Sequence, residues 1–221
     1  MKHVLLALLL PLSLLAQHSG SVEMEVKPFP TLPGRDYKVD QFVKSSASGY
    51  SLSEYQTEWF YWTNFSRSNP KRFWDSVVGP FLKVYPEMQN EYTKSLKKDL
   101  YGINSLPFLK PNNALLNMSQ KHASSLASIK ANPSHTSPNG STFQDRVKKA
   151  NIQKCAGENI SFGPRNAVLG IVLLYIDQGV PDLGHRRSLL DGSFAEMGIG
   201  IATYSNNNLM VVQDFSCNQN P

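Results

Sequence analysis

The pattern of apolar and polar positions predicts helices in the first half of the chain. Ser51 and Glu54 have the spacing of a capping box, so we expect a helix to begin there. Apolar side chains then recur every three or four residues, which is typical of a helix face packed on a core. This stripe consists of Leu52, Tyr55, Trp59 and Trp62. We predict a second helix after residues 69–70 and a third over about 86–100.

A longer helix is predicted over about residues 114–130. One face of it carries Leu115, Met118, His122, Leu126 and Ile129. The apolar surroundings favour a packed, hydrogen-bonded core role for His122 over contact with a ligand. A further helix is expected over about residues 141–150, where another capping-box spacing occurs.

The second half mixes strands and helices. Residues 155–162 form a short strand in our interpretation, and a helix follows residues 163–164. Its segment 168–176 is apolar on nearly every side, so we expect it to be buried between layers. A short helix is predicted over residues 184–190.

Two strands close the chain, residues 197–201 and 209–215, joined by a hairpin loop at 206–208. Gly198 and Gly200 alternate with apolar residues, which indicates that another backbone or side chain packs closely there.

These elements predict one mixed α and β domain over residues 51–217, preceded by an extended lead-in over 17–50 that is rich in Pro, Ser, Gly and Lys. Residues 1–16 are expected to be a signal peptide that is cleaved on export, because a lysine precedes a short apolar run that ends at an alanine. The run is too short and too poorly flanked for a transmembrane span. The protein is therefore expected to be secreted or periplasmic.

Composition narrows the function further. The 221 residues are 41% hydrophobic and 18% charged, which is ordinary for a globular protein. The net charge of +5 comes from scattered cations and short pairs, so we expect a solvated surface and no nucleic-acid partner. Only two cysteines exist, Cys155 and Cys217. Export favours a disulfide between them, with two buried free thiols as the alternative.

Four polar residues at turn signals form the candidate site: His135, Glu158, Asp177 and His185. Glu158 lies in an apolar segment, where a carboxylate is costly unless it is paired. His185 is near a helix start, which disfavours the imidazolium and keeps the ring neutral. Taken singly, His135 also fits a surface loop, Glu158 a structural carboxylate, and Asp177 an exposed helix end.

Together these four residues suit a Zn²⁺ site with water in an open position. The same set suits general acid and base chemistry without a metal, with Glu158 and Asp177 as the catalytic candidates. A structural network, in which the four groups bond one another and specify the fold, is the third alternative.

The order of these segments resembles a known family. It comprises His135-Thr-Ser-Pro, Gly157-Glu158-Asn159-Ile160, Gly184-His185-Arg186 and the strand Met197-Gly-Ile-Gly-Ile. This order resembles the CAP superfamily, which groups cysteine-rich secretory proteins, insect antigen 5 and plant pathogenesis-related class 1 proteins, and is similar to its secreted bacterial members with an SCP domain. The resemblance covers roughly residues 52–217.

The resemblance implies an α+β fold, a single α-β-α sandwich with a central, mostly antiparallel sheet flanked by helices. It also implies a cavity lined by two histidines and two acids. His135, Glu158 and His185 stand at the family's motif positions, and Asp177 stands where eukaryotic members carry Glu. The eukaryotic Gly-His-Tyr/Phe-Thr-Gln signature and the extra cysteines of those members are absent, so we do not carry over an expectation of sterol binding or of partner-channel activity.

We therefore expect an exported CAP-domain protein that binds a divalent metal, zinc first, and a small hydrophobic, lipid, peptide or envelope ligand. The alternative from another class is a metal-assisted hydrolase, in which an acid activates a zinc-bound water.

Overall fold

A central β-sheet organises the domain. The computed structural model describes residues 25, 27–205 and 208–219. The order of the four strands across the sheet is β1 (Lys110–Pro111), β3 (Glu196–Ser205), β4 (Asn208–Ser216) and β2 (Ala156–Pro164). β4 pairs antiparallel with both β3 and β2, whereas β1 runs parallel to β3. The expected mostly antiparallel sheet is confirmed, and β2 is its edge strand.

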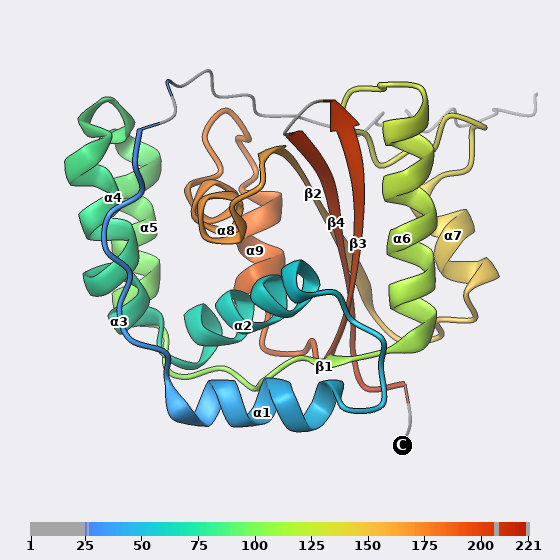
Figure 1. The fold of residues 1–221 in the computed structure, drawn as a ribbon, viewed down its shortest axis with the longest axis horizontal. Coiled ribbons are helices and arrows are strands. Elements are labelled where there is room, and N and C mark those ends of the chain that lie inside the picture. Colours follow the sequence, from blue (N-terminus) through green and yellow to red (C-terminus); the bar gives the residue numbers. More distant parts are fainter. Residues whose placement is uncertain (1–24, 26, 206–207, 220–221) are drawn as a thin grey trace, which may run out of the picture.

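Helices cover both faces of this sheet (Figure 1). On one face, α6 (Asn113–Ser128) packs on β3 and β4, and α7 (Phe143–Lys149) lies beside it. On the other face lie α2 (Glu54–Ser68), α8 (Ala167–Ile176) and α9 (Gly184–Leu190), which contact β3 or β2. The expected α-β-α sandwich is therefore confirmed.

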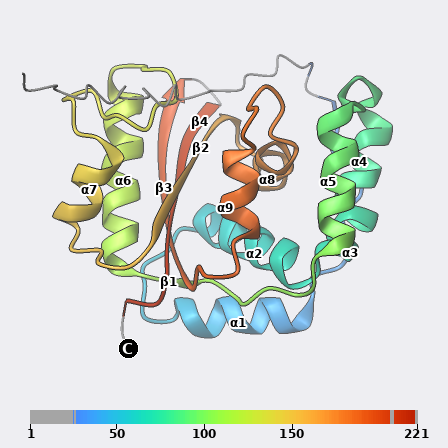
Figure 2. The ribbon, with the colours of Figure 1, turned by 180° about the vertical axis from the view of Figure 1, so that it is seen from behind.

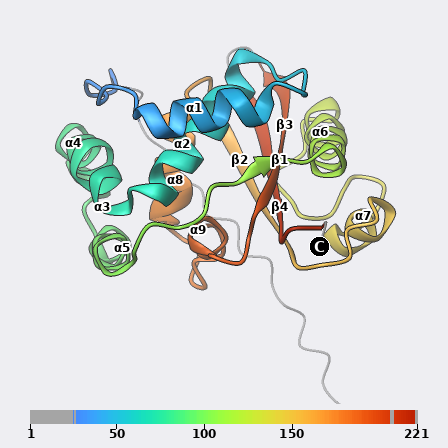
Figure 3. The same cartoon turned by 90° about the horizontal axis from the view of Figure 1, so that it is seen from below.

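The remaining helices extend the second layer outward. They are α1 (Tyr37–Ala47), α3 (Pro70–Phe73), α4 (Gly79–Val84) and α5 (Glu91–Gly102), with a π-helical turn at Trp74–Val78 and a 3₁₀ turn at Pro86–Met88. Figure 2 shows α3, α4 and α5 gathered beyond α8 and α9. α1 lies below α2 in Figure 1 and contacts the short strand β1, and the view from below shows α1 in front of α2 and beside β1 (Figure 3).

The aromatic stripe of α2 forms the centre of the main core, as predicted. Trp59, Phe60, Tyr61, Trp62 and Phe65 are all buried in it. The apolar helix α8 is buried against the same core, again as predicted. The layer that contains α2 and α8 is thus joined to the sheet mainly by hydrophobic burial.

Two glycines allow α6 to lie directly on β3. A Cβ atom added to Gly198 would come within 2.1 Å of the backbone of Leu115, and one added to Gly200 would come equally close to Ser119. No side chain fits into that space, so the predicted close approach is confirmed and its partner is the α6 backbone. Gln120 then fixes the register, since its side chain bonds both the N–H and the carbonyl of Ile201.

The lead-in is less extended than expected. Residues 37–47 form α1, because Asp36 caps it by accepting hydrogen bonds from two backbone N–H groups. Val39 and Val43, one turn apart, are buried beneath it. An apolar pair four residues apart is too brief a pattern to stand out in a segment rich in Pro, Ser and Lys.

Several predicted boundaries shift by a few residues. α2 begins after Ser53 rather than Ser51, because Ser53 and Gln56 form the capping box. The predicted third helix is divided, since Asn90 caps α5 separately from the 3₁₀ turn. β2 continues through residues 163–164, and Ile129 lies past the end of α6 with 62% of its surface exposed.

The predicted signal peptide, residues 1–16, lies outside the described residues. Within the described part of the chain, none of the helices combines the length and apolar character needed to cross a membrane.

The disulfide between Cys155 and Cys217 is confirmed. It joins the start of β2 to the end of β4, three residues from Glu158 and three from Asp214 in the sequence.

Candidate functional site

The first half of the candidate site is a histidine–carboxylate pair. His135 lies in the loop between α6 and α7, and its Nδ1 lies 2.8 Å from Oε1 of Glu158 on β2. A carboxylate only accepts, so this ring nitrogen carries the proton and donates it. The Glu158 side chain is almost fully buried, whereas 31% of the His135 side chain is exposed. The imidazole therefore connects a buried anion with the surface.

Arg146 completes the neutralisation of Glu158. From α7 it donates to Oε2 of Glu158 at 2.5 Å, to the His135 carbonyl at 3.0 Å and to Oγ of Ser137 at 3.1 Å. Burial by itself raises the pKa of the Glu158 carboxyl, but the His135 hydrogen bond and the Arg146 charge more than offset it. The pKa of Glu158 therefore lies below its ordinary value, and the group is an anion at neutral pH.

A second acid lies opposite Glu158 on the neighbouring strand. Asp214 on β4 is in register with Glu158 and is completely buried. Neither of its carboxyl oxygens has a hydrogen-bond partner among the described residues. Burial, and after it the Glu158 charge, raises the pKa of Asp214 well above its ordinary value. Asp214 thus keeps its proton to a higher pH than an ordinary aspartate, whereas Glu158 beside it ionises more readily than an ordinary glutamate.

The second half of the candidate site is built in the same way on the other layer. Nδ1 of His185 donates to Oδ1 of Asp177 at 2.6 Å. Oδ2 of Asp177 accepts the backbone N–H of Arg186 at 3.1 Å. Asp177 is 3% exposed and caps α8 in the left-handed conformation, with φ of 57°. Leu183, just before α9, has φ of 52°, which is unusual for a branched side chain.

Adjacent residues of β2 hold the two halves. Glu158 accepts from His135 on one face of the sheet, and Asn159 donates to the His185 carbonyl at 3.2 Å on the other. Successive strand side chains point to opposite faces, so the edge strand joins groups from both helical layers. The four predicted site residues are therefore brought together as two pairs that share one strand.

The pairing decides what each group has to offer chemically. Both oxygens of Glu158 and both oxygens of Asp177 already accept hydrogen bonds from the protein. His135 and His185 each donate through Nδ1, so the lone pair of each ring is on Nε2 and is available to a metal or a proton. Within the described ranges, no group of three or more His, Cys, Asp or Glu side chains is arranged to hold a metal ion.

Three contributors were missed by sequence reasoning: Arg146, Ser137 and Asp214. Arg146 had a signal, since it lies on the same side of a short helix as Phe143 and Val147 and is only 9% exposed. Ser137 is an ordinary loop serine in sequence terms. Asp214 lies in an apolar strand, where only the tertiary register shows that Glu158 is its neighbour.

His122 has the packed, hydrogen-bonded role that the helix pattern predicted. It is 1% exposed, its Nε2 lies 2.8 Å from the Ser134 carbonyl, and its Nδ1 lies 3.0 Å from Oγ of Ser137. Burial lowers the pKa of His122, and the Glu158 charge offsets this only in part. The ring is therefore neutral at pH 7.

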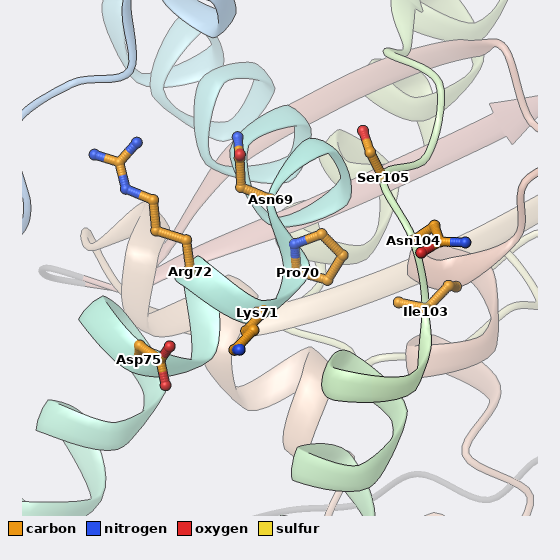
Figure 4. A pocket seen from close by; sticks show the side chains of 8 residues that line it. All are labelled: Asn69, Pro70, Lys71, Arg72, Asp75, Ile103, Asn104 and Ser105. Atoms are coloured by element: carbon orange, nitrogen blue, oxygen red, sulfur yellow. The ribbon is translucent and has the colours of Figure 1, made fainter.

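Two surface hollows lie elsewhere on the helical layer. One, of about 460 Å³, opens between the start of α3 and residues 103–105 (Figure 4). The other, of about 650 Å³, is lined by Leu183, Arg186 and Leu190 among others, so it borders the segment that carries His185. Neither hollow is lined by the four predicted site residues.

An α-β-α sandwich whose edge strand holds two histidine–carboxylate pairs defines a domain of the SCP class. Residues 104–215 match the CAP family, described as the cysteine-rich secretory protein family. This match spans just over half of the 221 residues, and the chain belongs to that family. A comparison with curated proteins gives no significant match.

The solved structures that match this chain include three from bacteria. An extracellular SCP-domain protein of Bacillus anthracis is 24% identical with a TM-score of 0.42, over 51% of this chain and 34% of that one. An outer surface protein of Borrelia burgdorferi is 19% identical with a TM-score of 0.42, over 60% and 92%. A cysteine-rich secretory protein of Staphylococcus aureus is 18% identical with a TM-score of 0.37, over 59% and 38%. This chain thus spans about a third of the Bacillus protein that it matches.

Proposed function

We propose that this CAP-domain protein is exported and binds a divalent metal, zinc first, through Nε2 of His135 and Nε2 of His185. The observation that carries the proposal is the identical second bond of the two rings: each Nδ1 donates to a buried carboxylate. Metal-binding histidines in proteins carry this arrangement, because the carboxylate fixes the tautomer and raises the basicity of the other nitrogen.

Glu158 and Asp177 act in this proposal by holding the histidines and not by contacting the metal. Their oxygens are already committed to His135, Arg146, His185 and the Arg186 backbone. Two imidazoles leave the remaining coordination positions to water or to a donor group on a bound ligand. The metal, when bound, would supply Lewis acidity and positive charge to the bound ligand.

The ligand in this proposal is a small hydrophobic, lipid or peptide component of the cell envelope that carries an oxygen donor. The hollow beside Leu183 and Leu190 combines apolar side chains with charged side chains of both signs close to the His185 segment, and such mixed linings suit an amphipathic ligand. Export is supported by the disulfide, since disulfides persist in oxidising compartments.

Zinc titration by calorimetry tests the proposal directly. The wild type should bind at pH 7.5 and bind more weakly at pH 5.5, because protonated imidazole is no ligand. His135→Ala with His185→Ala should abolish binding in a folded protein. Asp177→Asn should weaken it by about 10–100-fold, since the carboxylate supports its histidine. Asp182→Asn, an exposed acid nearby, is the matched control and should bind like the wild type.

Two results contradict the proposal. A wild type that releases no heat with zinc, while folded, shows that the histidines are not a metal site. If the double variant also fails to fold, the four groups are instead a polar network that specifies the structure.

A further inference from the structure

A serine–histidine pair lies next to the candidate metal site, and the metal proposal assigns it no role. Ser137 is two residues beyond His135, and its Oγ is 3.0 Å from Nδ1 of His122 on α6. Nε2 of His122 faces the Ser134 carbonyl at 2.8 Å. A carbonyl only accepts, so Nε2 carries the proton and Nδ1 has the lone pair. The Ser137 hydroxyl therefore donates to His122.

Arg146 fixes the direction of this hydrogen bond independently. Its Nη1 donates to the same Ser137 Oγ at 3.1 Å, so Oγ accepts from a cation and has its own proton left for His122. A guanidinium at this distance stabilises negative charge on the oxygen. A hydroxyl held between a cation and a neutral imidazole is the arrangement of an activated nucleophile.

The base has a third group behind it. Oε1 of Glu158 lies 4.0 Å from Nε2 of His122, beside the Ser134 carbonyl that orients the ring. Both groups favour positive charge on the imidazole when it gains a proton. The nucleophile Ser137 therefore contacts the base His122, and the Ser134 carbonyl on the far side of the ring orients that base.

The serine lies just below the surface. Ser137 is 8% exposed and begins the tight turn to Gly140, whose N–H bonds the Ser137 carbonyl at 2.8 Å. Residues 138–140 of this turn are exposed, and His135 on the other side is partly exposed. The exposed residues nearest to this serine in the sequence are therefore those of the turn, whereas both hydrogen bonds of Oγ are buried.

We infer that Ser137 is a nucleophile toward carboxylic esters, with His122 as its general base. Oγ forms a bond to the ester carbonyl carbon as its proton passes to Nδ1 of His122. The carbon–alkoxide bond breaks, and the leaving alcohol takes that proton. Water then attacks the acyl-serine, gives its proton to Nδ1, and Oγ recovers a proton as the acid leaves. The sum is one ester and one water giving one acid and one alcohol.

Diisopropyl fluorophosphate is the first probe, because Oγ displaces fluoride to form a stable adduct whose position is mapped by peptide mass spectrometry. The expected result is one adduct per protein on Ser137, in the presence of EDTA as well as without it. The chelator separates this inference from the metal proposal, because EDTA removes bound zinc and should leave the formation of the serine adduct unchanged. The mapping uses the wild type and depends on no variant being folded.

Variants sharpen the test. Ser137→Ala should give no adduct, and His122→Gln should slow its formation by about 100-fold, the usual share of a general base. Ser124→Ala removes an exposed hydroxyl on the same helix as His122 and should be labelled like the wild type. p-Nitrophenyl acetate should release a burst of about one equivalent of nitrophenolate from the wild type and none from Ser137→Ala.

The inference is overturned if folded wild-type protein gains no adduct, or if the adduct maps to any other residue. It is also overturned if His122→Gln, folded by circular dichroism, reacts as fast as the wild type.

Discussion

Glu158 and Asp214 face each other across the β2–β4 ladder, and their pKa values are shifted in opposite directions, that of Glu158 down and that of Asp214 up. The difference arises from their partners, because Glu158 has His135 and Arg146 while Asp214 has no hydrogen-bond partner in the described structure. Two carboxyl groups in contact cannot both ionise at low cost. The opposite pKa shifts therefore depend on which acid the imidazole N–H of His135 and the guanidinium of Arg146 reach.

Replacement of Arg146 should expose the cost of that arrangement. Arg146→Met leaves a buried carboxylate without its cation, and we expect the free energy of unfolding to fall by about 3–5 kcal/mol at pH 7. Urea denaturation measures this loss. Arg187→Met, which breaks an exposed pair with Asp182, is the control and should cost less than about 1 kcal/mol.

Arg146→Met should also change how the free energy of unfolding depends on pH. In the wild type, the lowered pKa of Glu158 contributes stability above its ordinary value of 4.5, and this is lost as the pH falls through the folded value. Without Arg146 that pKa rises, so the gap between variant and wild type should narrow from pH 7 to pH 5. A gap that is constant with pH, or no larger than that of Arg187→Met, contradicts this account.

The raised pKa of Asp214 should make stability depend on pH in the opposite direction. Its raised pKa contributes stability that is complete below its ordinary value of 3.8 and is lost as the pH rises toward the folded value. Asp214→Asn keeps the shape of the neutral acid and removes the titration. Between pH 4 and pH 7 the free energy of unfolding of the variant, relative to that of the wild type, should therefore rise by up to about 1.4 kcal/mol per pH unit.

Thermal unfolding across this range tests the prediction for Asp214. Asp182→Asn, at an exposed position, should follow the wild-type curve. Parallel pH profiles for Asp214→Asn and the wild type would show that Asp214 has the same pKa in the folded and unfolded chain.

The contact between α6 and β3 should tolerate no added carbon. Gly198→Ala and Gly200→Ala each place a Cβ about 2.1 Å from the α6 backbone, and we expect losses of about 3 kcal/mol or more. Gly102→Ala, where no atom lies within 4 Å of the added carbon, should be neutral or slightly stabilising. Equal midpoints for Gly198→Ala and Gly102→Ala in urea would contradict the observed contact.

The disulfide should stabilise the domain mainly through the unfolded chain. Cys155→Ser with Cys217→Ser opens a loop whose ends are 62 residues apart, and the chain-entropy relation gives a loss of about 4 kcal/mol. A reducing agent should lower the urea midpoint of the wild type to that of the double variant. It should leave the midpoint of the double variant unchanged. An unchanged wild-type midpoint under reduction would mean that the cross-link contributes nothing to stability.

The sequence alone determined the class of this protein. Periodicity marked the aromatic core helix, the apolar helix α8, the closing hairpin and the glycines under α6, because these signals are local and repeat over many residues. The CAP resemblance is likewise confirmed. The sequence also predicted the candidate site residues, because turn signals and polar residues in apolar segments can be recognised without a structure. These residues are His135, Glu158, Asp177 and His185.

Only the tertiary structure decided how these groups pair. The sequence suggested one cluster of four ligands, whereas in the structure each carboxylate, Glu158 or Asp177, accepts a hydrogen bond from Nδ1 of one histidine. Arg146, Ser137 and Asp214 entered the site through a helix face, a loop turn and a strand register that bring together residues far apart in the chain. Such contacts depend on how layers pack, and packing is a property of the whole fold and not of any local pattern.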